Sequence, residues 1–339
     1  MSKKVLVCGV GRMGRRHIRA AQHLGHSIVG FFDTSEVART ETFREFQLDP
    51  RTEYHDVNRM FAENKADVCI VATTTPTHAP FAIAAMKSGC RHVLIEKPVA
   101  SSIDECHKVM NTAKETGSIV AVNHPYSEIG LSKFIRNTVQ SNEFGGLSSC
   151  HIVGGDAGLA MNGIHFFDLF EFVAGSRIKE ISARLFAQLA QNPRGPQYND
   201  SSGIIDVSAA SGARLHIDIS NDHGVGRYGI FMGAGGSMRV DLLTSKYELS
   251  VRTATTRHLP STQYDAATFN SSGDAPPIDM VELSAQALDR LISDSPIADI
   301  YDGERFLRYL VACYVSSENH GLSADPLGAL PEDRKFLWA

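Results

Sequence analysis

The sequence of 339 residues lacks three features that would place it in a specialised class. It has no run of about 18 uncharged apolar residues, so we expect no membrane span and no membrane partner. It has no block of like charges, and a net charge of −5 does not indicate a nucleic-acid partner. Its six cysteines are scattered without a C-x-x-C pair, which is typical of reduced thiols in a cytoplasmic protein. Composition therefore predicts a globular cytoplasmic protein, long enough for two domains of about 100–200 residues each.

The N-terminal residues carry a pattern typical of a dinucleotide-binding fold. The apolar run Val5 to Cys8 predicts a strand buried on both faces, and residues 12–24 follow at helical spacing. Between them, Gly9, Gly11 and Gly14 give the G-x-G-x-x-G spacing, which brings helix N–H groups close to a pyrophosphate. A glycine turn in some other α/β protein is the alternative interpretation.

Asp33 follows a second predicted strand, Ser27 to Phe32, at the place where a carboxylate accepts hydrogen bonds from an adenosine ribose. A carboxylate repels a 2′-phosphate, so Asp33 favours NAD over NADP. Arg12 and Arg39 could each approach such a phosphate, and NADP stays possible.

Strands and helices alternate up to residue 122, which predicts a doubly wound parallel sheet. Further strands are predicted at 67–72, 91–95 and 118–122, with helices at 36–46, 56–63, 80–88 and 102–116. Ligands bind beyond the carboxyl ends of such strands, so residues there should line one crevice. Besides the glycines and Asp33, these residues are Thr73, Thr74, Pro76, His78, Glu96, Lys97 and Asn123.

From residue 124 the sequence changes to period-2 stretches joined by glycine turns, which predict a mostly antiparallel sheet. Strands are predicted at 181–185, 203–208, 214–220, 227–232, 237–241 and 247–252, and helices at 131–139, 280–292 and 303–317. Residues 192–203 and 268–277 are expected to form exposed loops, and residues 233–236 a hairpin turn. We expect an α/β protein with a Rossmann domain over 1–123 and an α+β domain with a large open sheet over 124–339.

His165 and Asp168 lie three residues apart in a predicted helical stretch, on one helix face. A histidine bonded within the core would give the same pattern. Two candidate ligands without an H-E-x-x-H motif do not predict a metal site.

The combination of these motifs resembles the glucose–fructose oxidoreductase/inositol dehydrogenase (Gfo/Idh/MocA) family, over essentially the whole chain. The matching pieces are Gly9-Val10-Gly11-Arg12-Met13-Gly14, Asp33, Pro76 with His78, Glu96-Lys97-Pro98, Leu159 with Gly163, His165 and Asp168, and Leu330-Pro331 with Phe336. The Glu-Lys-Pro tripeptide is the most specific of them. The resemblance implies a catalytic Lys97, a substrate-side acid/base His165, and a C-terminal sheet that mediates assembly into a homodimer or homotetramer.

Two positions depart from the family pattern. Many members carry an aspartate four residues before the histidine, where this chain has Met161, and a thioether neither carries charge nor accepts a strong hydrogen bond. Residues 124–126, after Asn123, stand where many members have an arginine. The expected substrate-side residues are therefore Asn123, Asn162 and Asp168.

The resemblance implies an NAD(P)-dependent dehydrogenase or reductase that moves hydride between the cofactor and a secondary alcohol or ketone. The expected substrate is a small carbohydrate: a sugar, cyclitol or sugar nucleotide. His165 suits a general base, Lys97 suits an oxyanion-stabilising donor, and which of the two takes the proton stays open. The expected cofactor-binding residues are Gly9, Gly11, Arg12, Met13, Gly14, Asp33, Thr73, Thr74, Pro76, His78, Glu96 and Lys97. A catalytically silent NAD(P)-binding regulator or sensor of the same fold is the alternative, to which Met161 points.

Overall fold

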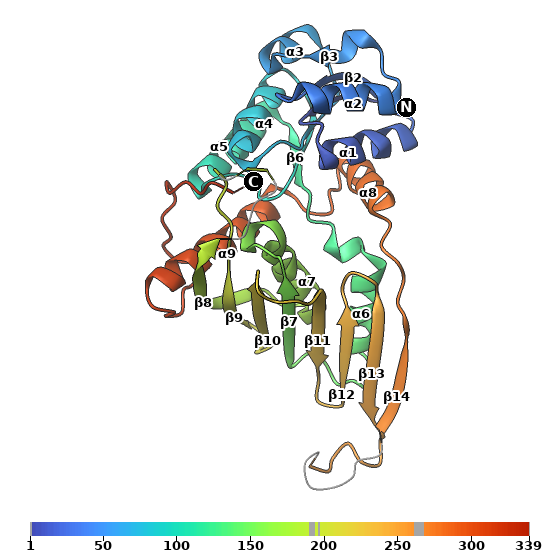
Figure 1. The fold of residues 1–339 in the computed structure, drawn as a ribbon, viewed down its shortest axis with the longest axis vertical. Helices are drawn as coiled ribbons and strands as arrows, with labels where there is room; N and C mark the ends of the chain where they lie inside the picture. The colour runs from blue at the N-terminus through green and yellow to red at the C-terminus, as the bar shows by residue number, and fades with distance from the viewer. Residues whose placement is uncertain (1, 190–193, 196, 261–267, 339) are drawn as a thin grey trace. The chain divides into compact units, whose positions relative to one another are not determined.

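The computed structural model describes residues 2–189, 194, 195, 197–260 and 268–338. The chain forms two compact units. Unit 1 comprises residues 1–125, 279–307 and 331–339, and unit 2 comprises residues 126–278 and 308–330. The chain therefore returns to unit 1 twice after residue 125 (Figure 1).

Unit 1 contains, in its described residues, a six-stranded parallel sheet in the order β3-β2-β1-β4-β5-β6. Its strands are β1 (Lys4–Cys8), β2 (Ser27–Phe32), β3 (Glu53–Tyr54), β4 (Val68–Val71), β5 (His92–Ile95) and β6 (Ile119–Val122). The strand order reverses between β1 and β4, and such a reversal is where doubly wound sheets bind ligands. The predicted Rossmann sheet is confirmed, with β3 as a short unpredicted edge strand.

The helices of unit 1 flank this sheet. They are α1 (Arg12–His23), α2 (Glu36–Phe46), α3 (Val57–Glu63), α4 (His78–Lys87), α5 (Ile103–Thr116) and α8 (Met280–Ile292). Helix α5 is capped at its N-terminus, because the Ser102 hydroxyl accepts a hydrogen bond from the Glu105 N–H at 3.1 Å. Leu288 and Leu291 of α8 belong to the same core as Val5 of β1, so a late segment completes the first domain.

In the part of unit 2 that the structure describes, eight strands form a sheet in the order β14-β13-β12-β11-β7-β10-β9-β8. Its strands are β7 (Ser149–Gly155), β8 (Ile178–Leu189), β9 (Ser201–Ala209), β10 (Arg214–Ser220), β11 (Arg227–Met232), β12 (Gly236–Asp241), β13 (Lys246–Arg252) and β14 (Thr268–Asp274). Strands β7 and β10 are parallel and all other neighbours are antiparallel, which confirms the predicted sheet class. Helices α6 (Gly130–Val139) and α7 (Ile164–Ala174) pack together, and Phe167 meets Tyr309 of α9 (Ile300–Glu318) edge to face.

Two loop predictions were wrong in part, because strands β9 and β14 occupy some of their residues, whereas residues 194, 195, 197–200 and 275–277 lie outside strands and helices. Residues 268–274 form β14, an edge strand whose backbone pairs with β13, so its polar sequence is compatible with a strand. Residues 201–203 begin β9 and Asp200 is buried, whereas residues 192, 193 and 196 of that prediction lie outside the described residues. The hairpin turn at 233–236 is confirmed, with the Gly233 N–H donating to the Gly236 carbonyl at 2.9 Å.

Within the described ranges, no helix combines the length and apolar character that a bilayer crossing requires. The same residues include no group of three or more His, Cys, Asp and Glu side chains placed to hold a metal ion. All six cysteines are free and buried.

Candidate functional site

The turn between β1 and α1 forms a glycine cradle, Gly9 to Gly14. Gly9 has a left-handed φ of +86°, and a Cβ there would lie 2.6 Å from the Ala72 carbonyl oxygen. A Cβ on Gly14 would lie 1.9 Å from the Gly9 carbonyl oxygen, so only glycine lets α1 begin against the turn. A Cβ on Gly11, in contrast, would meet no described protein atom within 4 Å. The cradle is closely packed at Gly9 and Gly14 and open at Gly11, which fits the approach of a pyrophosphate.

Helix α1 offers its N-terminus at this open position. Gly11 is the N-cap, and among the described residues no side chain caps the helix and no acidic residue occupies its first turn. The first N–H groups and the positive end of the helix dipole are therefore suited to an anion. Arg12 and Met13, both predicted cofactor ligands, form this first turn.

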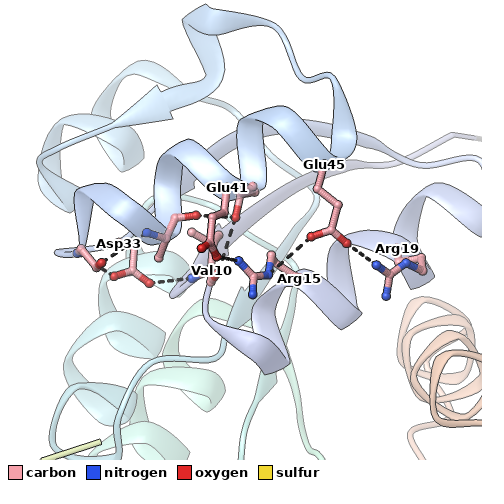
Figure 2. A network of polar contacts seen from close by, with 9 residues as sticks. Val10, Arg15, Arg19, Asp33, Glu41 and Glu45 are labelled. Atoms are coloured by element: carbon pink, nitrogen blue, oxygen red, sulfur yellow. Dashed lines mark hydrogen bonds and ion pairs between the residues drawn. The ribbon is translucent and has the colours of Figure 1, made fainter.

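Asp33 lies directly after β2, and its carboxylate joins the cradle to the segment before α2 (Figure 2). Oδ2 accepts a hydrogen bond from the Val10 N–H and Oδ1 accepts one from the Ser35 N–H, each at 2.8 Å. Arg15 of α1 pairs with Glu41 of α2 beside it. Two backbone donors thus orient the carboxylate, and each oxygen keeps a lone pair that a ligand hydroxyl can use.

The two arginines considered for a 2′-phosphate differ in their surroundings. Arg39 is buried, with Nε donating to Glu53 at 2.9 Å and a terminal nitrogen donating to the Asp33 carbonyl at 2.8 Å. Arg12 is exposed and has no ion pair among the described residues. Arg39 is therefore committed to Glu53, and Arg12 is the more accessible of the two.

The threonine-rich turn after β4 is tied to the loop after β5 through His78. Its Nδ1 lies 2.7 Å from the Pro98 carbonyl oxygen and its Nε2 lies 3.1 Å from the Thr73 carbonyl oxygen. His78 is buried, whereas Thr74 and Pro76 of the same turn are partly exposed. His78 thus holds two loops together, and the cofactor contacts predicted for this turn stay predictions.

Glu96 follows β5 and is the hub of a buried network. Its Oε1 lies 2.8 Å from His17 Nε2 and accepts a 2.8 Å hydrogen bond from the Asn123 side-chain amide. Its Oε2 accepts a 3.3 Å hydrogen bond from the Lys97 N–H. Burial raises the pKa of Glu96, but His17, the charge of Lys97 and the Asn123 amide together lower it to about 2. The carboxylate is therefore ionised at neutral pH.

The end of β6 adds Asn123 and His124 to this group. Asn123 is buried, and its Oδ1 has no hydrogen-bond donor among the described residues. His124 packs on Phe306, with ring centroids 4.6 Å apart. Burial lowers the pKa of His124, and the charge of Lys97 lowers it further, to about 3, so this imidazole is neutral at neutral pH. The structure thus brings together three predicted residues, Glu96, Lys97 and Asn123, at the carboxyl ends of β5 and β6.

In unit 2, His165 is the second residue of α7, and its ring stacks on Tyr126 of η3 (Tyr126–Glu128). The ring centroids are 4.9 Å apart and the planes differ by 20°. Asp168, one turn later, accepts a 3.4 Å hydrogen bond from the Tyr126 N–H. Burial raises the pKa of Tyr126 to about 12. Asp168 therefore holds Tyr126 in place, and Tyr126 covers one face of His165. Asn162, another predicted residue, is buried in the preceding turn, η4 (Leu159–Gly163).

A carboxylate does meet position 161, although it comes from a distant segment. Asp200 is buried, and its two oxygens accept hydrogen bonds from the N–H groups of Ala160 and Met161, each at 2.8 Å. A Cβ on Gly158 would lie 2.0 Å from Asp200 Oδ2, so glycine is needed for this approach. The first turn of η4 thus receives an ionic cap from outside the helix.

Sequence reasoning missed two of these side chains. His17 carried a usable signal, because it lies three residues after Gly14 on the same helix face, which packs toward the sheet. Asp200 carried none, because its partner Ala160 is 40 residues away and the residues around it look like a loop.

Comparison with known proteins identifies the N-terminal domain. Residues 3–124 match the family model described as "Oxidoreductase family, NAD-binding Rossmann fold". The cradle, α1 and Asp33 all lie within this match, so the predicted nicotinamide-dinucleotide fold is confirmed.

Relatives and solved structures extend the similarity beyond this domain. The 4-carboxy-2-hydroxymuconate-6-semialdehyde dehydrogenase of Sphingobium sp. is 24% identical over 72% of this chain and 82% of its own length. The scyllo-inositol 2-dehydrogenase (NAD(+)) of Bacillus subtilis is 23% identical over 63% of this chain and 66% of its own. An oxidoreductase from Agrobacterium radiobacter, solved with NAD+, L-tartaric acid and magnesium, matches 96% of this chain and 99% of its own at 18% identity and a TM-score of 0.77. The structural match shows a shared fold over both units.

Proposed function

Because this chain belongs to the Gfo/Idh/MocA oxidoreductase family through its NAD-binding domain, we propose that it is an NAD(P)-dependent dehydrogenase acting on a secondary alcohol. The proposed substrate is a small polyhydroxylated molecule of the sugar, cyclitol or sugar-nucleotide class. The opposite direction, reduction of the ketone, uses the same residues.

One observation supports this proposal above the others: the ionised Glu96 carboxylate organises Lys97 and Asn123 at the ligand-binding edge of the Rossmann sheet. Asn123 Oδ1 is a buried acceptor without a donor among the described residues, and a buried polar atom of this kind is costly unless a ligand satisfies it. A substrate hydroxyl or a carboxamide N–H supplies the missing donor.

The bound nicotinamide would supply the hydride acceptor, and the protein's own task is to orient the alcohol and handle its proton. We assign to Lys97 a charge-assisted hydrogen bond to the alcohol oxygen, which stabilises the negative charge that develops as hydride leaves the adjacent carbon. His124 is neutral at neutral pH, so it adds no second cation beside Lys97.

His165 is our candidate for the general base that takes the hydroxyl proton in the oxidation. Support comes from its local setting, in which Tyr126 stacks on one face of the imidazole and thereby limits its rotation. Asn162 and Asp168 are proposed to support substrate binding on the same side of unit 2.

The cofactor pocket is proposed to prefer NAD. The cradle would hold the pyrophosphate, and Asp33 would accept hydrogen bonds from the adenosine ribose. The carboxylate of Asp33 would repel a 2′-phosphate, and Arg39 is occupied by Glu53. Exposed Arg12 is the residue through which NADP could still bind.

The two named relatives act on different substrates, a cyclitol and a carboxylated semialdehyde, so the substrate of this chain needs a direct test. Calorimetric titration with NAD(H) and NADP(H) comes first, followed by a panel of sugars, cyclitols, sugar nucleotides and hydroxy acids assayed for NADH formation. Turnover with a polyol that Lys97→Ala abolishes, while NAD still binds, supports the proposal. Tight NAD binding without turnover across the panel would instead indicate a sensor. If the unmodified protein binds neither NAD(H) nor NADP(H), the cofactor assignment is refuted.

We also propose that the protein works in the cytoplasm as a homodimer or homotetramer, as its resemblance to the family implies. Size-exclusion chromatography with light scattering measures the assembly, and a monomer at micromolar concentration would refute it.

A further inference from the structure

His17 has no role in the function proposed so far, although its position is unusual for a polar side chain. It lies in α1, is fully buried, and directs Nε2 at Glu96 Oε1 over 2.8 Å. Because an ionised carboxylate only accepts hydrogen bonds, Nε2 must carry the proton. The other nitrogen, Nδ1, is buried and has no partner among the described residues. A buried imidazole with one unsatisfied nitrogen is a cost that its contact with Glu96 must offset.

The contact with His17 completes the coordination of the Glu96 carboxylate. Oε1 takes donors from His17 and Asn123, and Oε2 takes the N–H of Lys97. The three donors come from α1, the β6 end and the β5 end, so they hold three separate segments on one carboxylate. Without the His17 donor, Oε1 keeps one hydrogen bond, and the Glu96 side chain can rotate.

We propose that His17 is a positioning residue for Lys97: its N–H fixes the Glu96 carboxylate, and the fixed carboxylate holds Lys97 and Asn123 in their working arrangement. This inference rests on the proposed catalytic role of Lys97. It also links α1, whose N-terminus forms the cofactor cradle, to the lysine that acts on the substrate.

Charges around Glu96 decide what happens when His17 is replaced. The charged and titratable groups facing it are His17 and Arg16 of α1, its neighbour Lys97, and His124 after β6. Burial raises the pKa of Glu96 and His17 opposes this, so a residue without a donor makes the carboxylate easier to protonate. Glu96 still stays ionised at the alkaline pH at which a lysine titrates, so the position of its carboxylate is what changes there. A carboxylate that rotates away from Lys97 favours the ammonium less, and Lys97 should then lose its proton at lower pH.

Three variants separate positioning from simple packing. His17→Gln keeps an N–H donor near the Nε2 position, and His17→Met fills a similar volume without a donor. His92→Met is the matched control. His92 is also a buried histidine of unit 1, with Nε2 2.8 Å from the Asp294 carboxylate, but it lies at the opposite end of β5 from Glu96.

The first readout needs neither cofactor nor substrate. Each full-length protein is treated with acetic anhydride across a pH series, and acetylation of Lys97 is quantified by peptide mass spectrometry. We expect the midpoint for Lys97 to fall by about one pH unit in His17→Met, and to stay within about 0.3 unit in His17→Gln and His92→Met. Thermal unfolding identifies any variant that is not folded, and Glu96→Gln, which removes the charge with little change in volume, then replaces His17→Met.

The second readout is turnover with the best substrate of the panel. A displaced catalytic group costs about 10–100-fold in rate, so we expect a loss of that size in kcat for His17→Met with the KM for NAD unchanged. His17→Gln should lose less than about threefold. Equal losses in His17→Gln and His17→Met, or an unmoved Lys97 midpoint in folded His17→Met, would overturn the inference. Absence of turnover in the unmodified protein would count against the proposed function alone, because the acetylation midpoint tests His17 independently.

Discussion

Gly11 and Gly14 are three residues apart in one motif, yet the structure predicts opposite consequences for the same substitution. In Gly14→Ala the new methyl group would lie 1.9 Å from the Gly9 carbonyl oxygen, and in Gly11→Ala it would meet no described protein atom within 4 Å. We therefore expect Gly14→Ala to damage the fold of unit 1. Gly11→Ala should leave the fold intact and impair cofactor binding, because its methyl group occupies the open side of the cradle.

The contacts also set the expected loss of stability in Gly14→Ala and of NAD affinity in Gly11→Ala. Overpacking in a core typically costs about 1–3 kcal/mol and occasionally more, and the clash at Gly14 is with backbone atoms that cannot rotate away. We expect a loss of about 3 kcal/mol or more, which lowers the melting temperature of a domain of this size by roughly 6–12 °C. For Gly11→Ala we expect a melting temperature within about 2 °C of the unmodified protein, and an NAD Kd at least about tenfold higher, equivalent to about 1.4 kcal/mol.

The chain supplies its own probe for this assay. Trp338 is the single tryptophan, is buried in unit 1, and stacks on Phe336 with ring centroids 4.6 Å apart. Its fluorescence reports thermal unfolding of that unit, and calorimetry gives the NAD affinity of each variant. A Gly14→Ala protein as stable as the unmodified one, or a Gly11→Ala protein that binds NAD with unchanged affinity, would refute the reasoning.

Three other predictions follow from the same contacts. Asp33→Ser should weaken NAD binding by about tenfold and reduce the preference for NAD over NADP, because it removes the carboxylate that meets the ribose. Calorimetry with both cofactors checks this prediction, and an unchanged ratio of the two affinities would contradict it. The folded-state pKa of about 2 for Glu96 lies below its ordinary value of 4.5, so its contribution to stability is present above about pH 4.5 and is lost as the pH falls toward 2. In urea titrations between pH 6 and 3, the free energy of unfolding should therefore fall more steeply with acid for the unmodified protein than for Glu96→Gln. Tyr126→Ala should lower kcat about 2–12-fold, because the ring stack on His165 that it removes contributes about 0.5–1.5 kcal/mol. Tyr126→Phe keeps the ring, so its kcat should fall less than about twofold. Equal losses of kcat in the two variants would show that the hydroxyl group matters.

The Rossmann half was predictable because its signals are local. The apolar run of β1, the glycine spacing and the cap at Ser102 each lie within a few residues of the element that they define. Strand β2, helix α2 and helix α8 match their predicted bounds for the same reason. Failures came where pairing outweighs composition: β14 is polar and rich in serine, yet it is a strand because its backbone pairs with β13 along its whole length. Strand β7 was also not predicted, because it ends in Gly154 and Gly155, which look like a loop in the sequence.

The candidate site likewise has a part that local sequence predicted and a part that depends on residues distant in the chain. Sequence spacing placed Lys97, Glu96 and Asn123 at strand ends, because parallel strands bring their carboxyl ends to one edge of the sheet. It did not predict that Glu96 would be the hub, since that depends on His17, 79 residues earlier in the chain. Nor did it predict that Asp200 would cap the turn at Met161, since a carboxylate 39 residues away has no periodic relation to that turn.

Hydride transfer itself is the central claim, and one measurement tests it directly. Unmodified protein is mixed with NAD+ and carbon-deuterated polyols, perdeuterated glucose and inositol among them, and the mass of the reduced cofactor is determined. We expect NADH that is one mass unit heavier with the unmodified protein, and no reduction of NAD+ with Lys97→Ala at saturating NAD+. Unlabelled NADH, or no reduction by a protein that binds NAD+ tightly across the panel, would contradict it.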